Sequence, residues 1–243
     1  MLSDDIRMHS GVATMSREIV VGTAHKYNWF QLGAALKHPE VGKVIDLSED
    51  INKYASITDS NVKVMPSEGY GNSMVVRGLI EQEKPDAIFI FTDPRYWVWL
   101  FEIEREIRNK IPIVWLNIWD DYPAPMYNRN FYNSVDCLMG ISKQTVNINK
   151  LVLEEDAESK VIKYVPHGIN ENVFFPIKED HELYPKLLEF KKQTIKNDDI
   201  EFLAYFNSRN IHRKRPGDVI LAFKLFCDKI GPAAAKKVGL LVK

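Results

Sequence analysis

Short apolar runs alternate with segments of helical period along most of the chain. The clearest run is 87–91 (Ala-Ile-Phe-Ile-Phe), and 113–118 is nearly as clear. Runs that are apolar on both faces suit strands covered on both sides, and their alternation with helical patterns is typical of βαβ units. The expected strands are 27–32, 44–47, 62–65, 87–91, 113–118, 135–139 and 161–165, and the expected helices are 12–20, 73–82, 97–108 and 143–153.

Together these elements predict an α/β fold over residues 1–169, with a Rossmann-like parallel sheet and helices on both of its faces. Ser142 is the expected N-cap of the helix at 143–153, because its hydroxyl can accept a hydrogen bond from a free helix N–H. Only Met1 and Leu2 precede the polar triplet Ser3-Asp-Asp. We expect this triplet to form the loop after a shortened first strand.

A second α/β region is predicted at 200–243. It contains a strand at 200–206, a helix at 216–230 and the start of another strand at 238–242. Two strands and one helix are too few to enclose a core, so the pattern predicts an incomplete second Rossmann-like domain and a chain that is a fragment. The charged segment 170–199 is expected to connect the two domains as surface helix and loop.

Charge and cysteine content narrow the class of protein. The formal net charge is −1 over 243 residues, so no global field draws the chain to nucleic acid or membrane. Cys137 and Cys227 are far apart, and we expect two buried free thiols and no metal site. No apolar run approaches the ~20 residues of a membrane span, and no leader-like apolar core opens the chain. We expect a cytoplasmic protein, with peripheral membrane attachment as the alternative; the oligomeric state is not predicted.

A cationic loop lies between the strand at 200–206 and the helix at 216–230. It reads Asn207-Ser-Arg-Asn-Ile-His-Arg-Lys-Arg-Pro216. The N-terminus of the helix offers free N–H groups and a positive dipole end, and the loop adds guanidinium and ammonium groups. This arrangement predicts a phosphate site, with a solvated basic loop as the alternative.

Three segments carry a resemblance to a known family. They are Val165-Pro-His-Gly-Ile-Asn with Phe174-Phe-Pro176, then Phe206-Asn-Ser-Arg-Asn-Ile-His-Arg-Lys214, and Ser3-Asp-Asp with His9-Ser-Gly-Val-Ala13. With these motifs the chain resembles the GT-B glycosyltransferases, specifically the family 4 group of retaining enzymes. The likeness covers the N-terminal domain, the connection and the opening of the C-terminal domain.

The resemblance implies two Rossmann-like domains, of which the first faces the acceptor and the second binds a nucleotide-diphosphate sugar. It implies that Arg209 and Lys214 bind the donor diphosphate without a metal or other cofactor, and that Ser10 and Gly11 belong to a loop over the donor. Without the resemblance, Gly11 is explained equally well as an ordinary loop glycine that binds no ligand. Three departures stand out: Ser208 and Arg215 replace family glycines, His167 replaces an asparagine, and the family's two glutamates lie beyond the end of this chain.

Candidate chemistry also follows the strand at 113–118. Asp120 and Asp121 come at its carboxyl end, where ligands bind in parallel sheets. A carboxylate there can bind a sugar hydroxyl or act as the catalytic base toward the acceptor, and the family often has a histidine at this point. The alternative is a turn cap, a role that aspartate favours. His167 and Gly168 are expected at the domain junction, lining the cleft or filling a turn.

Aromatic residues are frequent around these loops, including Trp97, Trp99, Trp115, Trp119, Tyr122 and Tyr127. They are expected mainly in the core, with stacking on an acceptor sugar as the alternative. The sequence as a whole predicts a glycosyltransferase acting on an unidentified acceptor, which is a glycan, a lipid, a protein or a modified nucleic acid. The alternatives are an inactive GT-B-like domain and a phosphate- or nucleic-acid-binding module that uses the basic loop 209–215.

Overall fold

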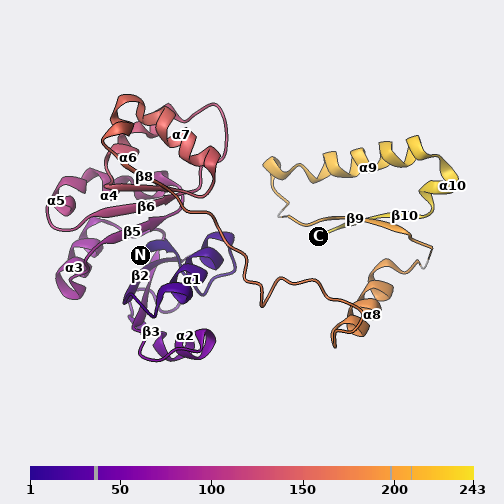
Figure 1. The fold of residues 1–243 in the computed structure, drawn as a ribbon, viewed down its shortest axis with the longest axis horizontal. Coiled ribbons are helices and arrows are strands. Elements are labelled where there is room, and N and C mark those ends of the chain that lie inside the picture. Colours follow the sequence, from indigo (N-terminus) through magenta and orange to yellow (C-terminus); the bar gives the residue numbers. More distant parts are fainter. Residues whose placement is uncertain (36–37, 198, 209) are drawn as a thin grey trace. The chain divides into compact units, whose positions relative to one another are not determined.

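A computed structural model describes the whole chain except residues 36, 37, 198 and 209. The described chain divides into two compact units, Met1–Asn170 and Glu171–Lys243 (Figure 1). Each unit is an α/β structure.

The first unit is built on an eight-stranded sheet with the order β3-β4-β2-β1-β5-β6-β7-β8. All neighbouring strands are parallel except β3, which pairs antiparallel with β4 at the edge. This confirms the predicted Rossmann-like sheet. The strands are β1 (Leu2–Asp4), β2 (Trp29–Ala35), β3 (Ile45–Asp46), β4 (Val62–Glu68), β5 (Ile88–Phe91), β6 (Ile113–Asn117), β7 (Cys137–Gly140) and β8 (Val161–Tyr164).

Helices connect these strands. They are α1 (Gly11–Thr23), α2 (Ser48–Ala55), α3 (Ser73–Glu83), α4 (Val98–Glu102), α5 (Glu104–Arg108), α6 (Arg129–Asn133) and α7 (Lys143–Leu153), with 3-10 turns η1 (Pro94–Trp97), η2 (Met126–Asn128) and η3 (Glu154–Glu158). Ser10, Asn72 and Ser142 cap α1, α3 and α7, because each side chain accepts a hydrogen bond from a backbone N–H in the first turn. The predicted cap at Ser142 is therefore confirmed.

Hydrophobic cores form on both faces of the sheet. Consecutive strand residues point to opposite faces, and Ile88 and Ile90 of β5 join one core while Phe89 packs against the other. The first core includes side chains from α3 to α7, such as Val76, and the second includes Val20 of α1 together with residues of α2. Helices thus cover both faces, as the sequence predicts (Figure 1).

Two details of the sequence prediction are wrong. Ser3 and Asp4 lie in β1, not in a loop, because β1 occupies the middle of the sheet between β2 and β5. The helix expected over 97–108 is interrupted at Ile103, which separates α4 from α5. Helices α2 and α6 have no counterpart in the prediction.

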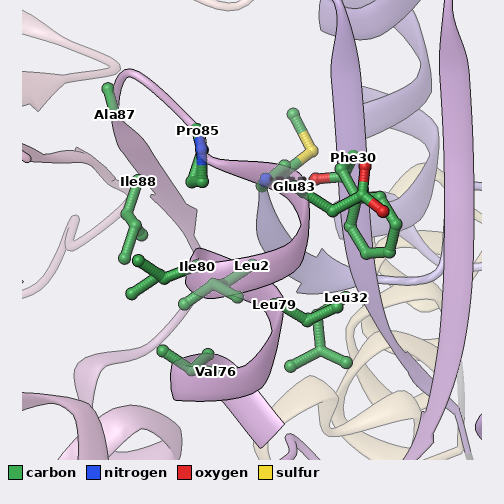
Figure 2. A pocket seen from close by; sticks show the side chains of 11 residues that line it. Leu2, Phe30, Leu32, Val76, Leu79, Ile80, Glu83, Pro85, Ala87 and Ile88 are labelled. Carbon is green, nitrogen blue, oxygen red and sulfur yellow. Dashed lines mark hydrogen bonds between the residues drawn. The ribbon is translucent and has the colours of Figure 1, made fainter.

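A small apolar cavity of about 50 Å³ lies between α3 and the amino ends of β1, β2 and β5 (Figure 2). Its walls include Leu2, Leu32, Val76 and Ile88. Pockets for small-molecule ligands occupy roughly 300–1,000 Å³, so this space, on the edge opposite the carboxyl ends of the strands, is a packing gap.

The second unit contains a parallel pair of strands joined through a helix. Its elements are α8 (Tyr184–Ile195), β9 (Phe202–Phe206), η4 (His212–Lys214), α9 (Pro216–Ile230), α10 (Pro232–Ala235) and β10 (Val238–Val242). The parallel pairing of β9 with β10 makes this a βαβ unit. The predicted strands and helix are present. Within the described chain, no helix combines the length and apolar character needed to cross a bilayer.

Candidate functional site

The direction of the sheet reverses between β1 and β5. From β1 the chain passes through α1 to β2 on one side, and after β4 it returns through α3 to β5 on the other side of β1. In open α/β sheets, ligands bind at such a switch point, outside the carboxyl ends of the strands. The loops after β1 and β5 are therefore the expected position of a ligand site.

Asp4 is the last residue of β1, and its carboxylate accepts hydrogen bonds from two hydroxyl groups at the switch point. Ser10 Oγ donates to one carboxylate oxygen at 2.6 Å, and the Tyr70 hydroxyl donates to the other at 3.2 Å. Burial and the neighbouring Asp4 carboxylate raise the pKa of Tyr70, so its phenol stays protonated and keeps donating. Asp4 thereby ties the loops after β1 and β4 together.

An aromatic stack continues from this cluster. Tyr70 lies face to face with Tyr96, with ring centroids 4.2 Å apart and planes inclined by 8°. Trp97 meets Tyr70 edge-on at 5.1 Å and is fully buried. Tyr96 itself is exposed, so the stack presents one ring to solvent at the carboxyl end of β5.

The turn after β5 is strained and closed by an ion pair. Thr92 has a φ of 151°, which a β-branched residue rarely adopts, and its carbonyl accepts a hydrogen bond from Trp115 Nε1. Asp93 accepts from the Arg95 backbone N–H and from its Nε, both at 2.9 Å. Burial acts to raise the pKa of Asp93, but the hydrogen bonds from Arg95 outweigh it and hold that pKa below its ordinary value. The Arg95 charge is therefore neutralised within the turn.

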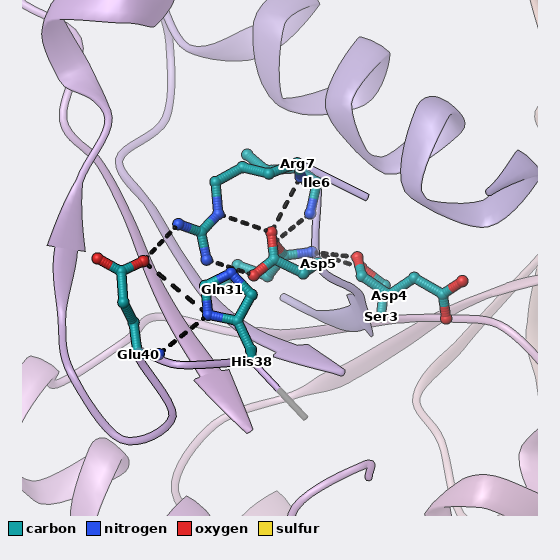
Figure 3. Close-up of polar contacts among 8 residues, drawn as sticks. All are labelled: Ser3, Asp4, Asp5, Ile6, Arg7, Gln31, His38 and Glu40. Atoms are coloured by element: carbon teal, nitrogen blue, oxygen red, sulfur yellow. Dashed lines mark hydrogen bonds and ion pairs between the residues drawn. The ribbon is translucent and has the colours of Figure 1, made fainter. Parts of the chain in front are cut away.

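Buried polar side chains support the loop after β1 (Figure 3). Gln31, in the middle of β2, donates to Ser3 Oγ at 2.7 Å and accepts from the Ile6 N–H at 3.0 Å. Asp5 is buried and receives the Arg7 guanidinium in two contacts, at 3.0 and 2.8 Å. These contacts fix the path of the chain from β1 towards Ser10.

Asn117 organises the loop after β6. Its Nδ2 donates to the Tyr132 hydroxyl at 2.9 Å and to Asn149 Oδ1 at 2.6 Å, and its Oδ1 accepts from the Trp119 N–H at 3.1 Å. Asn117, Tyr132 and Asn149 are all buried. This amide therefore anchors the segment that carries the two predicted aspartates.

Asp120 and Asp121 are exposed in that segment. Asp121 accepts a hydrogen bond from the N–H of the next residue, Tyr122, at 2.9 Å. The Asp120 backbone carbonyl accepts from Gln144 Nε2 at 2.8 Å. The structure places both residues after β6 on the carboxyl edge, and their role in chemistry stays a prediction.

We expect Asn117→Ala to lower the free energy of unfolding by about 2–3 kcal/mol, because it leaves Tyr132 and Asn149 buried without their partner. Chemical denaturation monitored by tryptophan fluorescence measures this. Asn147→Ala is the matched control, since Asn147 donates to the Tyr122 hydroxyl at the surface, and we expect a change below about 0.5 kcal/mol. Equal losses in the two variants would contradict the anchoring role of Asn117.

The other predicted residues of this unit lie at the same edge. Ser10 caps α1 and binds Asp4, so its hydroxyl is already engaged. Gly11 begins α1, and a Cβ placed on it would meet no atom within 4 Å, so its backbone faces open space. His167 follows β8 and meets Phe91, the last residue of β5, edge-on at 5.6 Å. Burial lowers the pKa of His167, so the ring is neutral at pH 7.

The segment after β8 continues across this unit. A Cβ placed on Gly168 would meet no atom within 4 Å. Asn170 Nδ2 donates to Glu18 Oε2 at 3.3 Å and to the Tyr54 hydroxyl at 3.2 Å, so the chain leaves β8 and reaches α1 and α2. The predicted hinge function of His167 and Gly168 stays a prediction.

The basic loop belongs to the second unit. Arg209 lies outside the described residues. Lys214 ends η4 and is exposed, and Arg215 directly precedes α9 with a φ of 47°, the left-handed conformation that glycine favours. Arg215 Nε pairs with Asp218 at 2.6 Å, so its charge is compensated. In the described parts of the chain, no group of three or more histidine, cysteine or acidic side chains is arranged to hold a metal.

Sequence reasoning did not single out Asp4, Tyr70, Arg95 or Tyr96 as a cluster. The signal that could have found them is position, because each follows a predicted parallel strand and all such ends share one edge. Among the aromatic residues, Trp97 and Trp115 are buried as expected, whereas Tyr122 and Tyr127 are exposed.

Comparisons with known proteins add little to this picture. No protein-family model matches the chain, and no curated protein matches it. Among solved structures, it is similar to the crystal structure of Medicago truncatula UGT71G1 complexed with UDP-glucose, with a TM-score of 0.46 and 9% identity over 99% of this chain and 70% of that one. A likeness of this degree has no bearing on family or activity.

Proposed function

We propose that this chain belongs to a glycosyltransferase that moves a sugar from a nucleoside-diphosphate sugar to an acceptor. The observation that carries the proposal is the strand–loop–helix from β9 to α9, in which a cationic loop leads directly into a helix N-terminus. Such a junction favours phosphate binding, because the helix dipole and the basic side chains act on the same anion. The polar switch point of the first unit and the family 4 motifs support the same activity.

The proposed chemistry needs charge stabilisation on the leaving group. When the bond between the anomeric carbon and the diphosphate oxygen breaks, negative charge develops on the departing nucleoside diphosphate. Lys214 and Arg209 would neutralise it, so no metal is required, and the family resemblance favours retention of anomeric configuration. Asp120 and Asp121 are the candidate groups for the acceptor hydroxyl and its proton, and Ser10, Gly11 and His167 would border the donor.

Binding of nucleotides tests this proposal. UDP, GDP, ADP, UDP-glucose and GDP-mannose would each be titrated into the chain, with binding followed by calorimetry and by phosphorus NMR. We expect saturable binding of one nucleotide and its sugar, which also identifies the donor class. If none of the five binds, and duplex DNA binds with steep salt dependence instead, the basic loop serves a nucleic-acid-binding module and the transferase proposal is wrong.

A further inference from the structure

Three tyrosines project from the loops after β5 and β6. Tyr96 is 48% exposed, Tyr122 is 50% exposed and Tyr127 is 67% exposed. Tyrosine combines an apolar ring with a polar tip, so these side chains suit a ligand that is partly apolar and rich in hydroxyl groups. They lie at the carboxyl edge of the sheet, beside the switch point.

The exposed rings are held in place by their neighbours. Tyr96 stacks on Tyr70, which is itself fixed by its hydrogen bond to Asp4. Tyr127 meets Trp119 edge-on, with ring centroids 6.0 Å apart. Tyr96 and Tyr127 follow the neighbouring parallel strands β5 and β6, so adjacent loops present the two rings at the same edge of the sheet. Preorganised rings lose little conformational entropy when a ligand binds.

The charges around these rings select the kind of ligand. The guanidinium of Arg95, the residue before Tyr96, is already paired with Asp93 through several hydrogen bonds. The neighbouring loop adds the exposed carboxylates Asp120 and Asp121. The surface is therefore neutral to acidic, which disfavours a phosphate, a phospholipid headgroup or a nucleic acid and favours an uncharged polyhydroxylated molecule.

We propose that Tyr96 and Tyr127 bind an uncharged saccharide, which is the acceptor of the transfer. The apolar C–H face of a sugar ring would pack on a tyrosine ring, and its hydroxyls would bond to the carboxylates and the guanidinium beside it. The assignment as acceptor rests on the proposed function, whereas saccharide binding at this surface does not.

Binding of neutral trisaccharides to the full chain tests the site without nucleotide. Maltotriose, cellotriose and chitotriose would be titrated individually by saturation-transfer NMR and tryptophan emission, with sucrose octasulfate as an anionic comparison. We expect at least one trisaccharide to bind, and Tyr127→Ala and Tyr96→Ala each to weaken it roughly tenfold, on the order of one lost aromatic stack. Tyr27→Ala is the matched control, because Tyr27 is 60% exposed just before the amino end of β2, and we expect unchanged affinity.

Each failure has a distinct meaning. Absence of binding by all three trisaccharides, stronger binding of the sulfated sugar, or equal loss in the Tyr27→Ala control would overturn the saccharide site. Tyr127→Ala remains informative if Tyr96→Ala unfolds, since its ring is largely in solvent. If a trisaccharide binds through Tyr127 while every nucleotide fails to bind, the saccharide site stands and the transferase proposal is the part that is wrong.

Discussion

We expect Arg7→Ala to lower the free energy of unfolding by about 3 kcal/mol, because it leaves the Asp5 carboxylate buried without its counter-charge. The Asp5 side chain is 1% exposed and the Arg7 side chain is 28% exposed. Removing one partner of a buried ion pair costs roughly 3–5 kcal/mol, and the partial exposure of Arg7 places the cost at the lower end, since water can enter where the guanidinium was. Urea denaturation at pH 7 measures the change.

Arg77→Ala is the matched control for that experiment. Arg77 also makes a two-point contact with a carboxylate, Glu106, but both side chains are exposed. Exposed ion pairs contribute ~0–1 kcal/mol, so we expect a change in that range. If the two arginine variants lose the same stability, burial of Asp5 is not what makes its ion pair matter.

The Asp5–Arg7 pair also bears on the site. Arg7 reaches Glu40 at 3.2 Å as well, so it links the loop after β1 to the chain that follows β2. Gly33 packs against Asp5 so closely that a Cβ there would lie 2.9 Å from the Asp5 Cβ. The position of the loop that leads to Ser10 therefore depends on a charge pair and on the absence of a side chain at residue 33.

Most of the sheet could be predicted from the sequence because its strands are apolar on both faces. Residues 87–91 and 113–118 stand out for this reason, and β5 and β6 occupy them. Strand β1 was predicted too short because Ser3 and Asp4 are polar. Their polar groups are satisfied by Ser10, Ser16, Gln31 and Tyr70, which lie 6 to 66 residues away, so the pattern within the strand does not show these partners.

The supporting polar residues left a weaker trace in the sequence. Gln31 interrupts the otherwise apolar strand β2, and Asn117 ends the otherwise apolar strand β6. A lone amide in a buried strand must find hydrogen-bond partners, so it marks a place where neighbouring loops are fixed. Reading these two residues in that way would have located the loops after β1 and β6. The stacking of Tyr70 on Tyr96 had only the weaker signal that both residues follow predicted strands, because the contact itself depends on the order of strands in the sheet.

The second large effect is expected at the basic loop. Lys214→Ala should weaken binding of whichever nucleoside diphosphate the chain binds by about 10- to 100-fold, since a hydrogen bond to a charged group contributes roughly 1.5–3 kcal/mol. Calorimetric titration of the variant beside the parent chain measures it. Arg209→Ala is expected to act in the same direction, because the family resemblance gives it the same diphosphate.

Arg215→Ala separates a specific phosphate contact from a general effect of charge. It removes one positive charge from the position next to Lys214, but Arg215 is already paired with Asp218. We therefore expect its affinity to stay within about threefold of the parent chain. Equal losses in the Lys214 and Arg215 variants, together disappearing at high salt, would mean that the loop attracts anions through its net charge alone. A loss confined to Lys214 would place that ammonium group on the diphosphate, where leaving-group stabilisation requires it.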